Sequence, residues 1–265
     1  MSVSRLRFAL ALALAGALVF GATPAATPVR AAEEPFVLRV PVLIYHHLRC
    51  DAPSWSPNAT LWMCAGKFEK QLTKLRSLGW RTITTDQLAD LVAARQCPPA
   101  RTMVVTIDDS EVNGFKVGAP ILERLGMRGT FFVLPGYSGR TGSLTYGQMR
   151  KLVARGHGIG NHTLTHRDLR GLSSTALFDQ VERAQRRLFK QLGFRPRTFA
   201  YPYAVWEDRA IARARNSGFE LAFTAGPGAK LSSDNPLLAP RIFVSRRLSP
   251  ADLATKIEKF ANPCD

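Results

Sequence analysis

The sequence has few histidines, few acidic residues and no long apolar segment. Its 265 residues include 5 His and 4 Cys, and 20 Asp and Glu stand against 36 Lys and Arg, a net charge of +16. No apolar run reaches the roughly 18 residues that a membrane-spanning helix needs, which excludes a polytopic membrane protein. Gly and Pro follow no period and no heptad pattern is sustained, which excludes collagen-like and coiled-coil proteins. An apolar fraction of 46% fits one globular domain.

The small number of cysteines argues against a zinc ribbon, because no CxxC spacing occurs. Cys50, Cys64, Cys97 and Cys264 allow three disulfide pairings. Cys50 and Cys64 flank one short loop, so we expect the bonds Cys50–Cys64 and Cys97–Cys264. Such bonds require an oxidising compartment.

The N-terminus has the order of a secretory signal. Two arginines precede an apolar stretch from Phe8 to Phe20, and small residues follow up to Ala31. We therefore expect a signal peptide over residues 1–31, a single domain over residues 32–265, and a secreted or periplasmic protein. An uncleaved anchor is the alternative.

Acidic residues remain scarce after removal of this segment, which holds three Arg and no acid. The remaining chain has 33 bases and 20 acids, a net charge of +13. This charge suggests an anionic cell-envelope surface as a partner, and a generally basic, solvated surface is the alternative. The bases are spread along the chain, with no run of five and no aromatic-interleaved RNA motif, so nucleic acid is not expected.

The remaining sequence alternates apolar segments of strand length with segments of helical period. The expected strands are 40–45, 80–84, 103–107, 129–134, 158–161, 198–201, 221–224 and 241–244. The expected helices are 68–78, 85–94, 117–125, 145–154, 173–192, 207–216 and 250–260. Strands that are apolar on both faces predict a parallel sheet covered by helices, an α/β fold. About seven such units favour a closed or nearly closed barrel over a doubly wound sheet, with its chemistry at the carboxyl ends of the strands.

Two adjacent carboxylates, Asp108 and Asp109, follow the apolar run 103–107. Neighbouring side chains of an extended backbone point in different directions. One carboxylate can therefore bind a cation while the other stays free as a base. The alternative is an Asp pair that caps the next helix.

The segment HTLTH over residues 162–166 places two of the five histidines four residues apart. On a helix this spacing brings both imidazoles to one face, a common way to hold zinc. Two loop histidines are the alternative. Asp109, His162 and His166 together would supply one oxygen and two nitrogens and leave a position open for water, as in a catalytic zinc site. Asp108 could then take the proton of that water.

A third feature, the segment FAYPY over residues 199–203, ends an expected strand with a rigid Pro between two tyrosines. Its backbone N–H groups could face a developing oxyanion. Packing is the alternative for these aromatic residues.

These motifs resemble those of one enzyme family. Residues 106–110, TIDDS, resemble the TFDDG motif of the polysaccharide deacetylases, the family-four carbohydrate esterases with a nodulation-type deacetylase domain. Residues 160–166, GNHTLTH, match the metal-binding histidine motif of this family, and residues 199–203 are similar to the FAYPY variant of its third motif. Residues 40–46 and 129–133 also resemble the family, so the resemblance runs from about residue 40 to residue 245.

The resemblance implies a distorted (β/α) barrel that removes acetyl groups from N-acetylated sugars. It makes Asp108 the general base and the backbone of Tyr203 an oxyanion donor. It also makes Asp109, His162 and His166 the ligands of one divalent metal. Zinc is the expected metal, and this ligand set would also accept Co²⁺, Ni²⁺ or Fe²⁺.

The sequence departs from the family pattern at several positions. Ser110 stands where Gly is usual, and Ala204 stands where Gly is common. The Arg that steadies the base in the usual third motif is Ala200 here. Arg241 could replace it from another strand.

The usual late histidine that supplies the general acid is also missing, because no His follows His166. The FAYPY and Pro-Arg-Ile pattern is similar to deacetylases of biofilm poly-N-acetylglucosamine, where an early Tyr-His lies close to the site. His46 is therefore the candidate general acid. We expect His47 and His157 to be structural or solvated.

The main functional hypothesis is a metal-dependent deacetylase of N-acetylglucosamine-containing polysaccharide, acting as a monomer. One alternative is an O-acetyl esterase that acts on xylan or wall sugars. The other is a catalytically weak barrel that binds polysaccharide through its aromatic residues and charge. The four residues Asp108, Asp109, His162 and His166 argue against the weak barrel, and the missing late His argues for it.

Overall fold

The centre of the fold is a parallel sheet whose strands follow the apolar runs of the sequence. The protein was analysed as a computed structural model, which describes residues 34–51 and 59–264. Seven strands lie in the order β10-β2-β4-β5-β6-β7-β8, and β3 pairs with β4 off this path. All of these pairings are parallel. The strands are β2 (Val42–Tyr45), β3 (Arg81–Ile83), β4 (Thr102–Ile107), β5 (Thr130–Val133), β6 (Gly158–Asn161), β7 (Thr198–Ala200), β8 (Leu221–Phe223) and β10 (Ile242–Phe243).

The chain between β8 and β10 brings the two edges of this sheet together. Ala239 forms a parallel bridge with Phe223 of β8, and its backbone exchanges hydrogen bonds with Ala222 and Thr224. The same segment continues into β10, which pairs with β2. The predicted distorted (β/α) barrel of about seven parallel strands is therefore confirmed.

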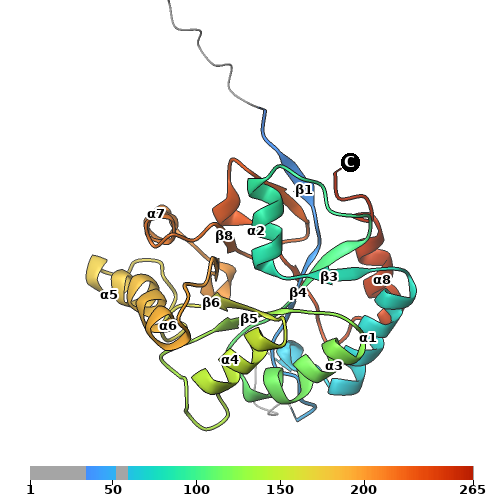
Figure 1. The fold of residues 1–265 in the computed structure, drawn as a ribbon, viewed down its shortest axis with the longest axis horizontal. Coiled ribbons are helices and arrows are strands. Elements are labelled where there is room, and N and C mark those ends of the chain that lie inside the picture. The colour runs from blue at the N-terminus through green and yellow to red at the C-terminus, as the bar shows by residue number, and fades with distance from the viewer. Residues whose placement is uncertain (1–33, 52–58, 265) are drawn as a thin grey trace, which may run out of the picture. The chain divides into compact units, whose positions relative to one another are not determined.

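Helices surround the sheet (Figure 1). They are α1 (Ala65–Ser77), α2 (Thr85–Ala93), α3 (Ala119–Arg124), α4 (Tyr146–Ala154), α5 (Ser174–Phe178), α6 (Ala184–Leu192), α7 (Asp208–Asn216) and α8 (Pro250–Glu258). Helix α2 begins at Thr85, as expected, and Thr84 before it forms a capping box with Gln87. Thr145 and Gln148 form the same arrangement at the start of α4.

Two of the helical segments contain a π-helical turn that the sequence pattern does not reveal. The segment η2 (Gly114–Gly118) leads into α3, and η3 (Asp179–Arg183) lies between α5 and α6. The expected helix 173–192 is thus α5, η3 and α6 in succession. Turns of this kind are frequent at functional sites. Short 3₁₀ turns are η1 (Ala59–Leu61), η4 (Pro202–Ala204) and η5 (Pro236–Leu238).

A small antiparallel sheet was not predicted. Strand β1 (Val37–Arg39) pairs with β9 (Lys230–Ser232), and the backbone N–H of Arg39 donates to Pro263 near the C-terminus. Each strand is only 3 residues long, which is too short for alternation to be recognised.

The disulfides Cys50–Cys64 and Cys97–Cys264 are present as predicted. The second of them joins residues 167 positions apart and ties the C-terminus to the body of the fold. The signal peptide expected over residues 1–31 lies outside the described residues. In the part of the chain that the structure describes, no helix is long and apolar enough to cross a membrane.

The polar residues are positioned by the strands that precede them, and these strands are fixed in the core. Every residue of β2, β4, β5 and β6 is buried, as expected for parallel strands covered on both faces. In a parallel sheet, the segments that follow the strands all begin at the same edge, where the carboxyl ends of the strands lie. The segments that carry Asp108, His162 and Tyr203 all follow the carboxyl ends of their strands, so the topology collects them at one edge.

Candidate active site

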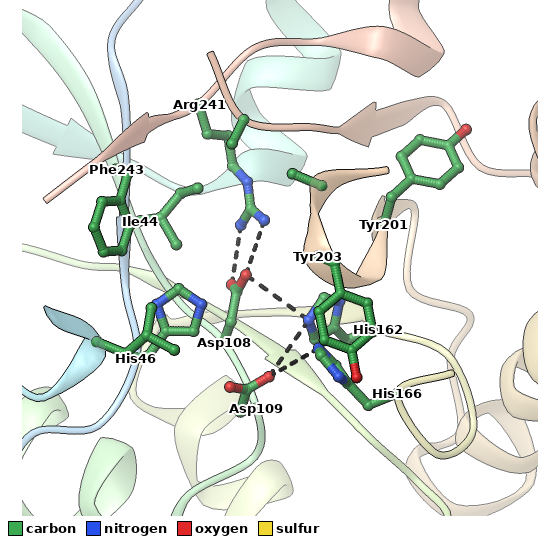
Figure 2. A pocket seen from close by; sticks show the side chains of 13 residues that line it. Ile44, His46, Asp108, Asp109, His162, His166, Tyr201, Tyr203, Arg241 and Phe243 are labelled. Atoms are coloured by element: carbon green, nitrogen blue, oxygen red, sulfur yellow. Dashed lines mark hydrogen bonds and ion pairs between the residues drawn. The ribbon is translucent and has the colours of Figure 1, made fainter. Parts of the chain in front are cut away.

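A buried ion pair between Asp108 and Arg241 lies at the centre of the site (Figure 2). Both side chains are 2% exposed. The Arg241 guanidinium donates from Nη1 to Oδ1 of Asp108 at 2.9 Å and from Nη2 to Oδ2 at 2.8 Å. Two further donors of Arg241 bind Thr106 Oγ1 at 3.1 Å and the Thr224 carbonyl oxygen at 3.2 Å. This bidentate pairing fixes the Asp108 carboxylate in one orientation.

The same arrangement keeps Asp108 ionised. Burial by itself would raise the pKa of Asp108, but the charges of Arg241, His162 and His46 outweigh burial and hold the pKa below its usual value. A carboxylate at this position is therefore available to accept a proton.

Asp109, the next residue, points in a different direction and meets two histidines. Its Oδ1 lies 3.5 Å from Nε2 of His162 and 3.3 Å from Nε2 of His166. Ligand atoms of these three residues all lie within 4.8 Å of one another. The structure thus brings together the three residues that the sequence proposes as metal ligands (Figure 2).

The orientation of His162 is set by the neighbouring strand. Its Nδ1 lies 2.7 Å from the carbonyl oxygen of Ala200 at the end of β7, so Nδ1 carries the hydrogen and donates it. Its Nε2 faces Asp109. Burial by itself would lower the pKa of His162, but the hydrogen bond to Asp109 and the charges of Asp108 and Asp109 outweigh burial and raise the pKa. Burial, followed by the charge of His162, lowers the pKa of His166 to about 4, so the His166 imidazole is neutral near pH 7.

This geometry fits a divalent metal. Oδ1 of Asp109 is buried and has no hydrogen-bond partner among the described residues, although two imidazole nitrogens face it. Two imidazoles, which bind zinc through an unprotonated ring nitrogen, and one carboxylate form a donor set typical of zinc, and they leave a coordination position open. Asp109, His162 and His166 are therefore the residues that would hold the metal.

The backbone is strained at each of the segments that carry these groups. Positive φ values occur at Asp109 (72°), Ser110 (60°), His166 (60°), Tyr203 (57°) and Ala204 (58°). Ser110 and Ala204 are the two positions where the family pattern has Gly, which adopts such angles without a steric cost. Ser110 is held in place because its hydroxyl accepts a hydrogen bond from the N–H of Leu134 at 2.5 Å. Strain of this kind persists where the surroundings enforce it and is concentrated at functional sites.

His46 follows the end of β2 and lines the same pocket as Asp108 and Asp109. Figure 2 shows it on the opposite side of the two aspartates from His162 and His166. Burial outweighs the nearby aspartates and lowers the pKa of His46, and its Nδ1 has no hydrogen-bond partner among the described residues.

Other walls of the pocket are apolar, and sequence reasoning did not identify them. Ile44, Leu61, Phe243 and Ala225 line it together with Tyr201. Ile44 and Phe243 belong to adjacent strands, β2 and β10, which pair at these two residues. The sequence offered one indication for Ile44 and Phe243: each lies in an expected strand close to a polar site residue, His46 or Arg241.

The side chain of Tyr203 lies at the mouth of the pocket. It is 65% exposed, and its ring centre lies 4.6 Å from that of His166. Tyr203, Asp109 and His166 also line a second hollow, whose other walls include Tyr137 and Thr165. The two adjoining hollows form a groove.

The remaining histidines lie elsewhere. His47 points away from the pocket, with Nδ1 3.0 Å from Glu111 Oε1 and its ring 4.1 Å from that of Trp62. His157 is buried before β6, at the opposite end of the sheet, where it contacts Glu123 and the N–H of Gly129. Neither residue faces the aspartates.

Comparisons with known proteins relate this chain to polysaccharide deacetylases. The family model for polysaccharide deacetylase matches residues 95–222. YxkH of Bacillus subtilis (strain 168), which carries the provisional name of a polysaccharide deacetylase, is 25% identical over 224 residues, covering 84% of this chain and 77% of YxkH. The poly-beta-1,6-N-acetyl-D-glucosamine N-deacetylase of Staphylococcus aureus (strain MRSA252) is 20% identical over 193 residues, covering 68% of this chain and 66% of that protein. The structure of Streptococcus pyogenes deacetylase PplD in complex with acetate superposes with a TM-score of 0.77 and 26% identity, covering 83% of this chain and 98% of that one.

Residues 95–222 therefore form a polysaccharide deacetylase domain. This domain indicates a hydrolase that removes acetyl groups from polysaccharide, in a family whose members depend on a metal.

Proposed function

We propose that this protein is an exported, metal-dependent hydrolase that removes N-acetyl groups from N-acetylglucosamine-containing polysaccharide. The observation that carries the proposal is that one pocket joins the Asp109, His162 and His166 donor set to an ionised, buried Asp108 and to His46. Each of these groups answers a requirement of amide hydrolysis.

A bound divalent metal would supply a Lewis acid that polarises the acetyl carbonyl and activates water near pH 7. Asp108 is the proposed base, because its Oδ2 lies 3.9 Å from Nε2 of the proposed ligand His162 and therefore borders the space that the ligands face. It takes one proton from the attacking water while the oxygen of that water bonds to the acetyl carbon. Arg241 is the proposed positioning residue, because it holds the carboxylate ionised and in one orientation.

His46 is the proposed general acid. Amide cleavage expels an amine, which leaves readily only if the nitrogen receives a proton as the C–N bond breaks. Imidazolium suits this role because it is a stronger acid than the amine that leaves, and burial, which lowers the pKa of His46, makes its protonated form a stronger acid still. The products are acetate and the free amino sugar, so one water is consumed for each acetyl group released.

Tyr203 is the proposed oxyanion donor through its backbone N–H. Its left-handed φ of 57° turns the chain sharply after β7, at the edge of the pocket that holds the other groups. Backbone donors of this kind act on the negative charge that develops on the carbonyl oxygen in the transition state.

The proposed substrate and compartment rest on independent observations. The Staphylococcus aureus relative is named for poly-β-1,6-N-acetylglucosamine, and the groove past Tyr203 gives room for a polymer on both sides of the reacting sugar. Two disulfides support export, and so does the order of residues 1–31, in which arginines precede an apolar stretch and small residues. Residues 32–265 would then be the mature domain. The net charge supports contact with an anionic cell envelope.

Acetate release tests the proposal. Purified protein loaded with Zn²⁺ is incubated with oligomers of β-1,6-linked N-acetylglucosamine, with chitin oligomers and with acetylated xylan, and Asp108→Asn serves as the inactive control. We expect acetate from the N-acetylated oligomers and not from xylan. Acetate from xylan alone would make the protein an O-acetyl esterase, and binding without acetate release would make it a polysaccharide-binding barrel.

A further inference from the structure

The loop that joins the two proposed metal-binding histidines is held in a strained conformation. Thr163 has a φ of 72° and His166 a φ of 60°, and neither is a glycine. Such a backbone conformation is unfavourable for a residue with a side chain and persists only where the surroundings enforce it. Within the loop, Thr163 Oγ1 accepts a hydrogen bond from the N–H of His166 at 3.0 Å. The two residues between them, Leu164 and Thr165, have their backbone groups bound from outside the loop.

The N–H groups of Leu164 and Thr165 both donate to a single residue, Gln180. The carbonyl oxygen of Gln180 accepts from Leu164 N–H at 2.9 Å, and its Oε1 accepts from Thr165 N–H at 3.0 Å. Its Nε2 donates to the hydroxyl of Thr165 at 2.9 Å. Gln180 is 5% exposed, so these three hydrogen bonds are formed away from solvent.

The π-helical turn explains why the backbone of Gln180 is available. Gln180 lies in η3, where the regular α-helical bonding of the chain is interrupted between α5 and α6. A carbonyl in such a turn is released from its usual partner four residues later and can accept from elsewhere. Here it accepts from the loop, and the side chain of the same residue binds the adjacent N–H.

The two carbonyl groups of the loop are bound from the opposite side. The N–H of Gly136 donates to Leu164 O at 2.9 Å, and the hydroxyl of Tyr137 donates to Thr165 O at 3.0 Å. A Cβ at position 136 would lie 2.3 Å from Leu164 O, so only glycine permits this approach. All four backbone polar groups of Leu164 and Thr165 are thus bound by residues 136, 137 and 180.

We propose that Gln180 is a positioning residue that sets the separation of His162 and His166 before any metal binds. The proposal rests on the proposed function, because it takes these histidines as ligands. The hydrogen bonds from residues 136, 137 and 180 hold the strained loop in place without a metal. Metal binding therefore does not have to order the loop, and its free energy is not reduced by that cost. Partners of this kind, which do not themselves touch the metal, typically change affinity by about 10–100-fold.

The test compares the zinc affinity of purified variants by competition with a chelating dye, and their folding by thermal melting in excess chelator. Gln180→Leu removes both side-chain bonds and should weaken zinc binding by about 10–100-fold. Gln180→Glu should restore the affinity, because a carboxyl group accepts from both the N–H and the hydroxyl of Thr165. The control is Gln71→Leu. Gln71 is equally buried and bonds Tyr45 and Leu248 on the other side of the fold, so this change should lower the melting temperature and leave zinc affinity unchanged.

Each outcome bears on one of the two ideas. A wild-type protein that binds no divalent metal would contradict the proposed function. A wild type that binds zinc, with Gln180→Leu binding equally well, would overturn the positioning role of Gln180 alone. An equal loss of affinity in Gln71→Leu would overturn it too, since general destabilisation would then be the cause. If Gln180→Leu does not fold, Thr165→Val decides: removal of one hydrogen bond should weaken zinc binding by about 2- to 10-fold, and unchanged affinity overturns the proposal.

Discussion

Two clusters of histidine and carboxylate lie at opposite ends of the same sheet, and only one has the properties of an active site. At the amino end of the strands, Nε2 of His157 lies 2.9 Å from Glu123 Oε1, and its Nδ1 accepts from the N–H of Gly129 at 3.1 Å. Arg155 binds the same Glu123 oxygen at 2.6 Å. Both ring nitrogens of this histidine therefore have a partner of the correct polarity.

At the carboxyl end, the same residue types are left with unused lone pairs. His162 and His166 turn Nε2 toward Asp109, whose Oδ1 has no hydrogen-bond donor among the described residues. Buried polar atoms without partners are costly, so a fold retains them where a ligand completes them. The two clusters have the same residue types, so composition does not distinguish them; they differ in whether their buried polar atoms have partners.

The largest expected effect tests this distinction directly. His166→Ala should abolish stoichiometric zinc binding and activity, because two ligands remain where three are needed. The matched change His157→Ala should lower the melting temperature and leave zinc content intact. Metal analysis of both purified variants is the measurement, and full zinc occupancy in His166→Ala would rule out the proposed ligand set.

The second prediction compares one carboxylate from each end of the sheet, Asp108 and Glu123. Asp108→Asn should reduce turnover by about 10²–10⁴-fold and retain zinc, because the amide cannot accept the proton of the attacking water. Glu123→Gln should leave turnover near the wild-type value. Steady-state rates and metal content are measured on the same samples. Loss of zinc from Asp108→Asn would mean that Asp108 and Asp109 have exchanged the roles assigned to them.

A smaller and more selective effect is expected at His46. His46→Ala should reduce deacetylation of an N-acetylglucosamine oligomer far more than hydrolysis of an activated acetyl ester, whose leaving group needs no proton. The ratio of kcat/KM for the two substrates is the readout. Equal losses on both, with zinc retained, would assign His46 to orienting the site instead of donating the proton.

The smallest effect is the pH signature of the amino-end cluster. Burial, opposed by Glu123, lowers the pKa of His157, with Arg128 and Arg155 lowering it further. As the pH falls through about 6.5, the unfolded chain takes up a proton at this residue while the folded protein does not, so stability falls. His157→Gln should therefore lose less stability than wild type between pH 7 and pH 5. Denaturant melts of both proteins in chelator measure this, and identical pH slopes would show that the folded His157 titrates normally.

Much of the barrel was predictable because its strands carry a local signal. The segments that form β4 and β5 are mostly apolar in sequence, which identifies them as buried strands, and in the structure every residue of both is buried. The β1–β9 pair was not predictable, because its strands are short and their pairing depends on residues nearly 200 positions apart in the sequence.

The site was predictable to the extent that its residues are adjacent in sequence. Asp108 with Asp109 and His162 with His166 form short motifs, and the structure brings all four to one pocket. The apolar walls of the pocket and Gln180 carry no such pattern. Gln180 is a glutamine within a helix, and nothing in its neighbours indicates that a π-helical turn presents it to a loop 15 residues away.

The sequence by itself determined the main strands and helices of the barrel and which residues are chemically able to hold a metal and move protons. These properties follow from side-chain chemistry and from patterns along short stretches of the chain. Tertiary structure alone decided that Arg241 binds Asp108, across 133 residues of sequence, and that two histidines point their nitrogens at Asp109 while a third is satisfied elsewhere. The reason is physical: whether a buried polar atom is satisfied depends on which distant groups the packing of the whole sheet brings within hydrogen-bond distance.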